Sequence, residues 1–208
     1  MATAMTFSRR ELVTGLLPFV GLGSWSSSVA AAMPAPVEMP SRLWLVREHD
    51  GTEIMTAFRN GAGYDHGAIL ELSWLWRDNE DGRAIWIEPR LFDALAAIQT
   101  GIGRANGALL PLVLASGCRS PAHNGATEGA ARQSTHIDGL AGDVRIPSVE
   151  PRIVALAAAM CGAGGVGLYP NHVHVDVWRR RFWVDPKIDV GAALPAAPRP
   201  SSGKGNPS

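Results

Sequence analysis

One five-residue segment constrains the fold of this chain more than any other: His172-Val173-His174-Val175-Asp176. Side chains alternate between the two faces of a β-strand, so the histidines and the aspartate share one face and the valines share the other. The valine face is expected to pack against a hydrophobic core. A face with two imidazoles and a carboxylate indicates either an exposed polar surface or a site for metal binding or catalysis.

A second polar segment supplies partners for this strand. His136 precedes a glycine turn at Gly139, and Asp143 follows on a short predicted strand where it shares a face with Ala141. Such a turn could bring His136 and Asp143 around one point, where His174 would complete a set of two histidines and one aspartate. Three ligands of this kind suit a catalytic zinc ion, which keeps a fourth position for water.

The elements predicted around these two segments indicate an α+β fold. The Asp50-Gly51 dipeptide between two apolar runs predicts a hairpin. Apolar spacing, or a proline in a first turn, predicts helices at residues 69–76, 89–102 and 151–160. Further strands are predicted at residues 110–116, 142–146, 166–169 and 173–177. We therefore expect a small antiparallel or mixed sheet with flanking helices.

The two ends of the chain differ from this central part. Arg9 and Arg10 precede a short apolar run, a Gly/Ser stretch and three alanines, the order of a twin-arginine export signal. A membrane span needs about 20 apolar residues, and this run is shorter. We predict an export signal at 1–32, a Pro-rich connector at 33–40, a folded domain at 41–185 and a disordered tail at 186–208. The mature protein is then expected in the periplasm, without a stable membrane span.

Composition excludes several classes of protein. Lys plus Arg and Asp plus Glu each number 19 in 208 residues, and the zero net charge becomes −1 when Arg9, Arg10 and Glu11 leave with the signal. Nucleic-acid binding is not expected from a chain without a cationic excess. Cys118 and Cys161 are too few for a thiolate zinc site. Both a disulfide between them and two buried free thiols remain open.

The segment Ser134-x-His136-x-x-Gly139-x-Ala141-x-Asp143, followed by His174, resembles the zinc D-Ala-D-Ala peptidase group. This group belongs to the clan named after lysostaphin, D-Ala-D-Ala peptidases and sonic hedgehog. Within it, the twin-arginine-exported murein endopeptidases of the MepK type are the most similar, and the resemblance covers about residues 42–183. It rests on the segments Ser116-Gly117-Cys118-Arg119-Ser120, Gly164-Gly165-Val166-Gly167-Leu168-Tyr169-Pro170 and Val173-His174-Val175-Asp176.

This resemblance implies a hedgehog and D-Ala-D-Ala peptidase-like fold and a role for individual side chains. The zinc ligands implied by the resemblance are His136, Asp143 and His174, with Ser134 and Gly139 supporting the ligand turn. Arg119 would orient the substrate carbonyl or stabilise the tetrahedral oxyanion. Water activated by zinc would attack the amide.

The general base is left open between two residues. Asn171 stands where many relatives carry a glutamate, three residues before the last zinc histidine. Asp176 is the nearest carboxylate on the ligand face, and His172 is the first histidine of a His-x-His pair. MepK-type proteins often carry Phe at the His172 position, and an exposed histidine without a role is the alternative there. Cys118 replaces the usual tyrosine, and the 121–133 loop looks shorter than in relatives, so substrate preference also stays open.

The expected function is an exported, monomeric zinc metallopeptidase that hydrolyses peptide cross-links in peptidoglycan, whose peptide stems are its partner. Two alternatives use the same scaffold: a D,D-carboxypeptidase, and a non-catalytic domain that binds the wall or stores zinc. A non-haem iron oxygenase also uses two histidines and a carboxylate. It is disfavoured because those sites place His and Asp two apart on one strand, whereas His136 and Asp143 are seven apart.

Three signals are not taken as functional. The G-x-G-x-x-G at residues 162–167 has a helix before it and a strand after it, the reverse of a dinucleotide loop. The run Arg179-Arg180-Arg181 is interpreted as a solvated strand end. The tryptophans are interpreted mostly as core or rim packing.

Overall fold

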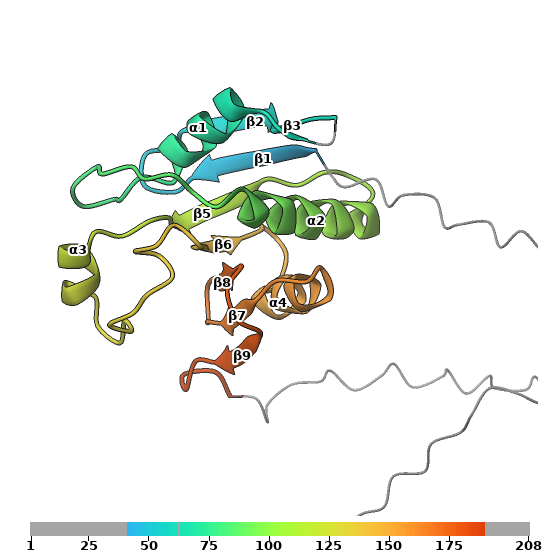
Figure 1. Ribbon diagram of the computed structural model, residues 1–208. Helices are drawn as coiled ribbons and strands as arrows, with labels where there is room; N and C mark the ends of the chain where they lie inside the picture. The colour runs from blue at the N-terminus through green and yellow to red at the C-terminus, as the bar shows by residue number, and fades with distance from the viewer. Residues whose placement is uncertain (1–40, 62, 190–208) are drawn as a thin grey trace, which may run out of the picture. The chain divides into compact units, whose positions relative to one another are not determined.

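The fold is that of a computed structural model, which describes residues 41–61 and 63–189. Within this part, a seven-stranded mixed sheet has the order β2-β1-β5-β6-β8-β7-β9, and a second, two-stranded sheet is a small hairpin of β3 (Arg59–Asn60) and β4 (Gly63–Tyr64) (Figure 1). The predicted α+β class with a mixed sheet is confirmed. The predicted export signal, the connector and the tail beyond residue 189 lie outside the described residues.

The strands of the large sheet are short, and they pair antiparallel except between β1 and β5 and between β7 and β9. They are β1 (Arg42–Arg47), β2 (Glu53–Ala57), β5 (Leu112–Ser116), β6 (Ala141–Arg145), β7 (Gly165–Leu168), β8 (Val173–Asp176) and β9 (Arg181–Val184). The predicted hairpin is β1–β2, with Gly51 at a φ of 72° in its turn. Only glycine takes this left-handed conformation at no steric cost.

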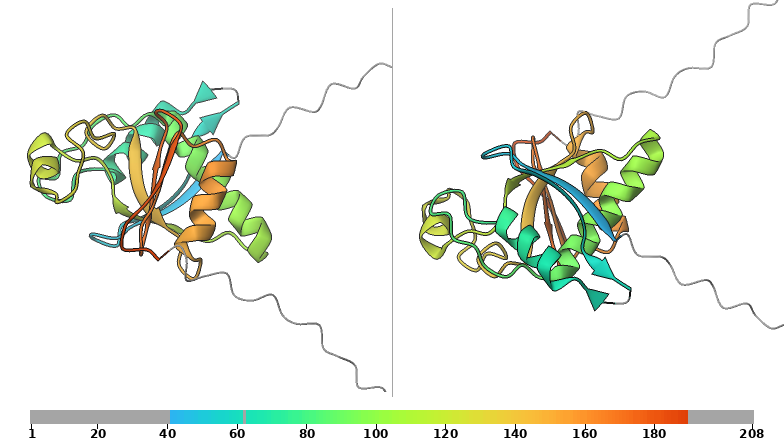
Figure 2. Two further views of the ribbon diagram at one scale, coloured as in Figure 1. Left: turned by 90° about the horizontal axis from the view of Figure 1, so that it is seen from below. Right: turned by 90° about the horizontal axis from the view of Figure 1, so that it is seen from above.

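Helices pack on the apolar face of the sheet. They are α1 (His66–Leu75), α2 (Pro89–Asn106) and α4 (Pro151–Met160), and a short α3 (Pro121–Ala126) follows β5. Figure 2 shows α2 and α4 lying together against the sheet, in agreement with their mutual contacts and with those of α4 to β7 and β8. Among the described residues, none of the helices combines the length and the hydrophobicity that a membrane crossing requires.

The two faces predicted for the histidine strand are confirmed in β8. Val173 and Val175 are fully buried in the core, together with Val144 of the neighbouring β6. The opposite face of β8 carries His174 and Asp176, which are also buried although they are polar. These two buried polar groups therefore need hydrogen-bond or metal partners, which the hydrophobic core cannot supply.

Trp76, at the end of α1, lies in the core and contacts both β6 and the segment that follows β5. Its indole Nε1 donates to the Ala141 carbonyl at 2.9 Å, and its own carbonyl accepts the Cys118 amide at 2.8 Å. Two glycines allow this approach, because a side chain at Gly117 would collide with the Trp76 carbonyl and one at Gly142 with the indole ring. Glycine is the residue that permits such close backbone contacts.

The disulfide that the sequence left open is not formed, since Cys118 and Cys161 are both free thiols. Cys118 follows β5 and Cys161 ends α4 just before β7, and β6 and β8 lie between these two strands. Three strand spacings amount to roughly 14 Å. A disulfide needs Cα atoms closer than about 7 Å. Instead, Cys118 donates to the Arg83 carbonyl at 3.3 Å, and burial raises the pKa of its thiol.

Strand β9 was not predicted from the sequence. Only its first residue, Arg181, belongs to the arginine run interpreted as a solvated strand end, yet Gly165–Leu168 and Arg181–Val184 pair in parallel register at the edge of the sheet. An edge strand is solvated along one side, so its sequence lacks the clear alternation of a central strand.

Replacing Gly117 by alanine is expected to destabilise the fold by about 1–3 kcal/mol, because the new methyl group would collide with rigid backbone at Trp76. Gly101→Ala is the matched control: Gly101 lies in α2 with open space at its Cβ position. That change should stabilise by about 0.5–1 kcal/mol, since glycine is unfavourable inside a helix. Urea unfolding of both variants checks this, and equal midpoints would contradict the close approach.

Candidate metal centre

The pairing of β6 with β8 sets two of the three predicted ligands side by side. In this antiparallel pair Asp143 stands directly opposite His174, so both side chains leave the same face of the sheet. Asp143 is 6 % exposed and His174 is 7 % exposed. Both are thus held in an environment with little access to water.

The third residue, His136, reaches the same point from a tight turn. Amides of the turn donate to its own carbonyls, from Ile137 to Ser134 at 3.0 Å and from Leu140 to Thr135 at 2.9 Å. Gly139 has a φ of 69° and lies against the Trp86 carbonyl, where a Cβ would come within 2.6 Å. The turn predicted from the sequence at this glycine is therefore present.

The three side chains converge on one point. His136 Nε2 lies 3.1 Å from His174 Nδ1 and 3.3 Å from Asp143 Oδ1, and the last two atoms are 3.1 Å apart. All candidate ligand atoms of the group lie within 4.8 Å of one another. Two imidazole nitrogens and one carboxylate oxygen, all buried, are a donor set that fits a mononuclear metal ion of the zinc type. The residues present therefore fit a metal.

Each histidine is oriented by a partner behind it. His136 Nδ1 lies 2.6 Å from the Gly117 carbonyl, and His174 Nε2 lies 3.1 Å from Asp176 Oδ2. Both partners can only accept, so a proton on either of these nitrogens would be held by a hydrogen bond. The other nitrogens, His136 Nε2 and His174 Nδ1, lie beside Asp143 Oδ1 and would present lone pairs to a metal ion bound there.

Asp143 is held by Arg119, which the resemblance had assigned to the substrate. One terminal nitrogen of Arg119 donates to Asp143 Oδ2 at 2.6 Å, and its Nε donates to the Ser116 hydroxyl at 3.1 Å. Burial by itself would raise the pKa of Asp143, but His136 and His174 beside it outweigh burial and lower that pKa well below its ordinary value. Asp143 is therefore an ionised carboxylate.

Ser134 lies in the same turn, where its hydroxyl accepts the His136 amide at 3.3 Å. Both Ser134 and its neighbour Thr135 are buried. The two side chains that precede His136 are thus largely shielded from water.

The two candidates for the general base have different surroundings. Asp176 is completely buried and accepts the Gly165 amide at 2.8 Å, the Trp178 amide at 2.9 Å and an Arg181 nitrogen at 2.6 Å, in addition to its contact with His174. Its two oxygens are therefore committed to the protein.

His172, in contrast, is half-buried and precedes β8 instead of lying within it. Its ring is stacked on Tyr169, with centroids 4.6 Å apart and an interplanar angle of 9°. Nδ1 lies 2.8 Å from Asn171 Oδ1. Burial lowers the pKa of His172, an effect opposed by Asp143 and reinforced by His174 and Arg119. The ring is therefore biased toward its neutral form.

The loop that carries Arg119 is tied down by Asp78, which the sequence analysis did not single out. The buried Asp78 carboxylate accepts the Ser120 amide at 2.6 Å and the Glu80 amide at 2.8 Å, and it lies 2.7 Å from His123 Nδ1. No local pattern marks this aspartate, because Asp78 and Ser120 are 42 positions apart. The contact orients the loop and, through it, Arg119.

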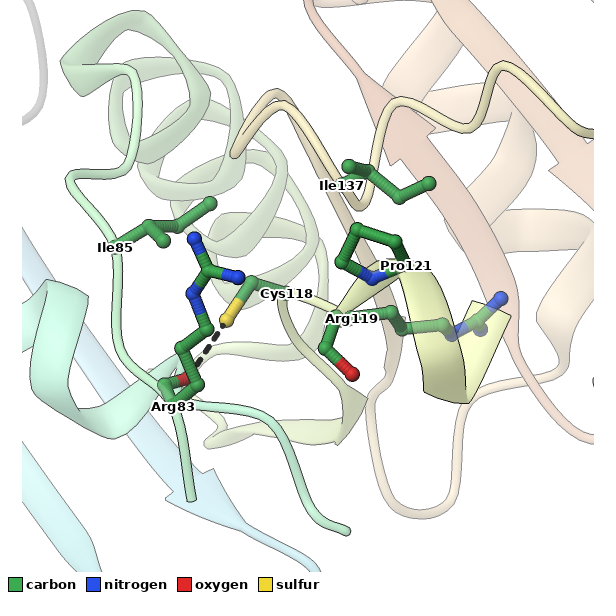
Figure 3. Close-up of a pocket in the computed structure, with 7 residues that line it drawn as sticks. Arg83, Ile85, Cys118, Arg119, Pro121 and Ile137 are labelled. Carbon is green, nitrogen blue, oxygen red and sulfur yellow. Dashed lines mark hydrogen bonds between the residues drawn. The ribbon is translucent and has the colours of Figure 1, made fainter. Parts of the chain in front are cut away.

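Two hollows flank the turn that carries His136, and Ile137 lines both. The smaller, of about 60 Å³, lies among Arg83, Ile85, Cys118 and Pro121, and Arg119 at its rim extends away from Arg83 (Figure 3). The larger, of about 400 Å³, is lined by Arg132, Gln133, Ser134, Thr135, Asp138 and the half-exposed Trp178. Neither of these two hollows is lined by His136, Asp143 or His174 themselves.

A mixed sheet that presents a buried His-Asp-His group matches the peptidase-like arrangement implied by the sequence. The family profile described as "Peptidoglycan L,D-endopeptidase MepK" matches residues 36–183. The chain is 32 % identical over 182 residues to the Peptidoglycan L,D-endopeptidase MepK of Escherichia coli K12, covering 85 % of this chain and 97 % of that protein. It is 30 % identical over 170 residues to the Probable peptidoglycan L,D-endopeptidase MepK of Haemophilus influenzae, covering 79 % of this chain and 89 % of that protein.

The chain therefore belongs to this peptidase family, within the D-Ala-D-Ala peptidase-like clan, as the resemblance indicated. No solved structure gives a significant match.

Replacing Asp78 by asparagine is expected to cost about 1.5–3 kcal/mol of stability at neutral pH, because the buried carboxylate receives several hydrogen bonds. Burial by itself would raise the pKa of Asp78, but these bonds outweigh burial and hold that pKa below 3.8. The charged form thus stabilises the fold fully above pH 3.8, and this stabilisation is lost as the pH falls further, through the lower pKa of the folded state.

Urea unfolding between neutral pH and pH 3 measures this effect. The difference between wild type and Asp78→Asn should shrink as the pH falls below 3.8. Asp81→Asn, in the same loop but exposed, should stay close to wild type throughout. A difference that is independent of pH would contradict the role of the charge.

Proposed function

We propose that this chain is an exported zinc peptidase that hydrolyses peptide cross-links in peptidoglycan. The single observation that carries the proposal is the buried His136–Asp143–His174 group, whose candidate ligand atoms converge on one point. Membership of the MepK family points in the same direction. The names of its relatives suggest that the bond is an L,D cross-link.

We propose His136, Asp143 and His174 as the zinc ligands. Zinc in such a site lowers the pKa of a bound water toward neutrality and polarises the scissile carbonyl. Arg119 then has two tasks. It holds Asp143 through one terminal nitrogen, and its other terminal nitrogen is the group we assign to the substrate carbonyl oxygen, where negative charge develops during attack.

We assign the general base to His172. A base needs an accessible lone pair and a pKa suited to the working pH. The oxygens of Asp176 are taken up by backbone amides and by Arg181, whereas His172 is half-buried and its pKa is lowered by burial. Asn171 Oδ1 at Nδ1 would keep the proton on that nitrogen and leave Nε2 as the acceptor.

An endopeptidase is favoured over the carboxypeptidase considered as an alternative. The substrate of an endopeptidase continues on both sides of the cleaved bond, whereas a carboxypeptidase acts on a chain end. The family description and the names of the relatives, which are all endopeptidases, support the first. A catalytic role is favoured over a purely wall-binding domain because Arg119 and His172 flank the metal group.

We also propose the arrangement of the whole chain. Residues 1–32 would direct twin-arginine export and be removed, residues 33–40 would connect, and residues 41–185 would act in the periplasm as a monomer. Residues 186–208 would form a tail outside the catalytic domain. Peptidoglycan peptide stems are the proposed partner.

Defined cross-linked muropeptide dimers test the function. The purified mature protein should contain about one zinc per chain and split L,D cross-linked dimers, and a chelator should abolish cleavage. His136→Ala should lose both zinc and cleavage. His49→Ala is the matched control, because His49 is exposed and lies outside the metal group, and it should behave as wild type.

Mass spectrometry of the products separates the alternatives. Splitting of dimers indicates the endopeptidase, and release of terminal D-Ala alone indicates the carboxypeptidase. Undiminished cleavage by a metal-free His136→Ala protein would rule out the proposed mechanism.

The base assignment has its own test. His172→Phe keeps an aromatic ring for the Tyr169 stack but removes the proton acceptor. The variant should bind zinc as wild type does, while kcat falls about 10²- to 10⁴-fold, the usual contribution of general base catalysis. A variant with normal kcat would show that His172 is not the base.

A further inference from the structure

Arg181, which has no part in the proposed metal chemistry, holds Asp176 beside the candidate ligand His174. Asp176 lies completely buried behind His174, and its Oδ2 contacts His174 Nε2 at 3.1 Å. Arg181 donates to the same Oδ2 at 2.6 Å and, from its other terminal nitrogen, to Oδ1 at 3.4 Å. The Gly165 and Trp178 amides complete the surroundings of Oδ1. A buried carboxylate is thereby neutralised and fixed in one rotamer.

Arg181 is itself held in place by its position in β9 and by two tryptophan rings. It is the first residue of β9 and stands opposite Gly165 in the register of β7 with β9. Its guanidinium lies 5.4 Å from the ring centre of Trp178 and 5.2 Å from that of Trp183, within cation–π distance of both. A planar guanidinium can contact two rings and still fork onto a carboxylate, which an ammonium cannot do.

Two glycines of β7 make room for this arrangement. A Cβ at Gly165 would collide with Asp176 Oδ2 and the Arg181 guanidinium, and one at Gly167 would collide with the Trp183 ring. The Trp183 ring in turn packs 5.1 Å from the His174 ring, and its Nε1 donates to the Tyr169 hydroxyl at 3.1 Å. The glycine run, the arginine run and one tryptophan, all set aside in the sequence, thus meet behind a single metal-facing histidine.

We propose that Arg181 is a positioning residue for the metal centre: by clamping Asp176, it keeps the proton of His174 on Nε2 and the lone pair of Nδ1 directed at the metal. The inference rests on the metal centre proposed above. Carboxylates that hold a ligating histidine in this way typically contribute 10- to 100-fold to metal affinity. Here Arg181 would act on the metal indirectly, through Asp176 and then His174. It lies in β9, a strand that carries none of the candidate ligands.

Zinc affinity of the metal-free protein, measured in competition with a chromophoric chelator, is the primary test. Arg181→Met should weaken zinc binding about 10- to 100-fold, and Arg181→Lys should recover only part of this loss. Arg180→Met is the matched control: Arg180 is an exposed neighbour in the same run, and its loss should leave the affinity unchanged.

A double-mutant cycle with Asp176→Asn distinguishes positioning from a general loss of structure. If Arg181 acts through Asp176, Arg181→Met should weaken binding less than about threefold further in the Asp176→Asn background, because the effects of coupled residues do not add. The double variant removes the buried carboxylate together with its partner, so it leaves no unpaired buried charge. If Arg181→Met alone fails to fold, zinc binding of the double variant is compared with that of Asp176→Asn.

Nitrogen-15 NMR of the zinc-loaded protein gives a direct readout of the imidazole. The Nε2 proton of His174 should be visible and protected from exchange in wild type, and it should exchange faster in Arg181→Met. A folded Arg181→Met protein with wild-type zinc affinity and a protected proton would overturn the proposal. Failure of the wild-type protein to bind zinc at all would instead overturn the metal centre itself.

Discussion

The antiparallel register between β6 and β8 is the constraint on which the rest of this structure depends. It places Asp143 opposite His174 on one face and Val144 opposite Val173 on the other. The side-chain period of a strand is two, so a slip of one residue would move the valines out of the core and the candidate ligands into it. Burial of the valines therefore stabilises the fold and also holds two of the three ligand side chains together. The core and the candidate site thus lie on opposite faces of the same two strands.

Support for the polar face comes from both sides of these strands. Toward β5, Trp76 packs against Gly117 and Gly142, and the Gly117 carbonyl orients His136. Toward β7, Gly165 leaves space for Asp176, which orients His174. The glycines at these positions therefore permit close approach between backbone and side chains. Each histidine is held by an acceptor that is itself fixed by packing, which is how metal sites keep their geometry.

The structure also gives different surroundings to Asp176 and His172, the two candidates for the general base. Asp176 is completely buried and accepts several hydrogen bonds, whereas His172 is half-buried and its Nδ1 lies beside Asn171 Oδ1. Arg119 is bonded to Asp143 through one terminal nitrogen and to Ser116 through Nε. The net charge of the chain is zero, so the proposed binding of peptide stems would have to rest on local groups and not on bulk charge.

The sequence by itself was enough for the α+β class, the β1–β2 hairpin, the two faces of β8, the three candidate ligands and the family. These follow from local periodicity, turn residues and short motifs, all of which act over a few positions. It was not enough for β9, for the separation of Cys118 from Cys161, or for the partners Asp78–Ser120 and Asp176–Arg181. Those depend on the order of strands in the sheet and on which side chains meet across it. Such contacts join separate elements, and only the tertiary structure decides them, because no local pattern records which buried charge will find which partner.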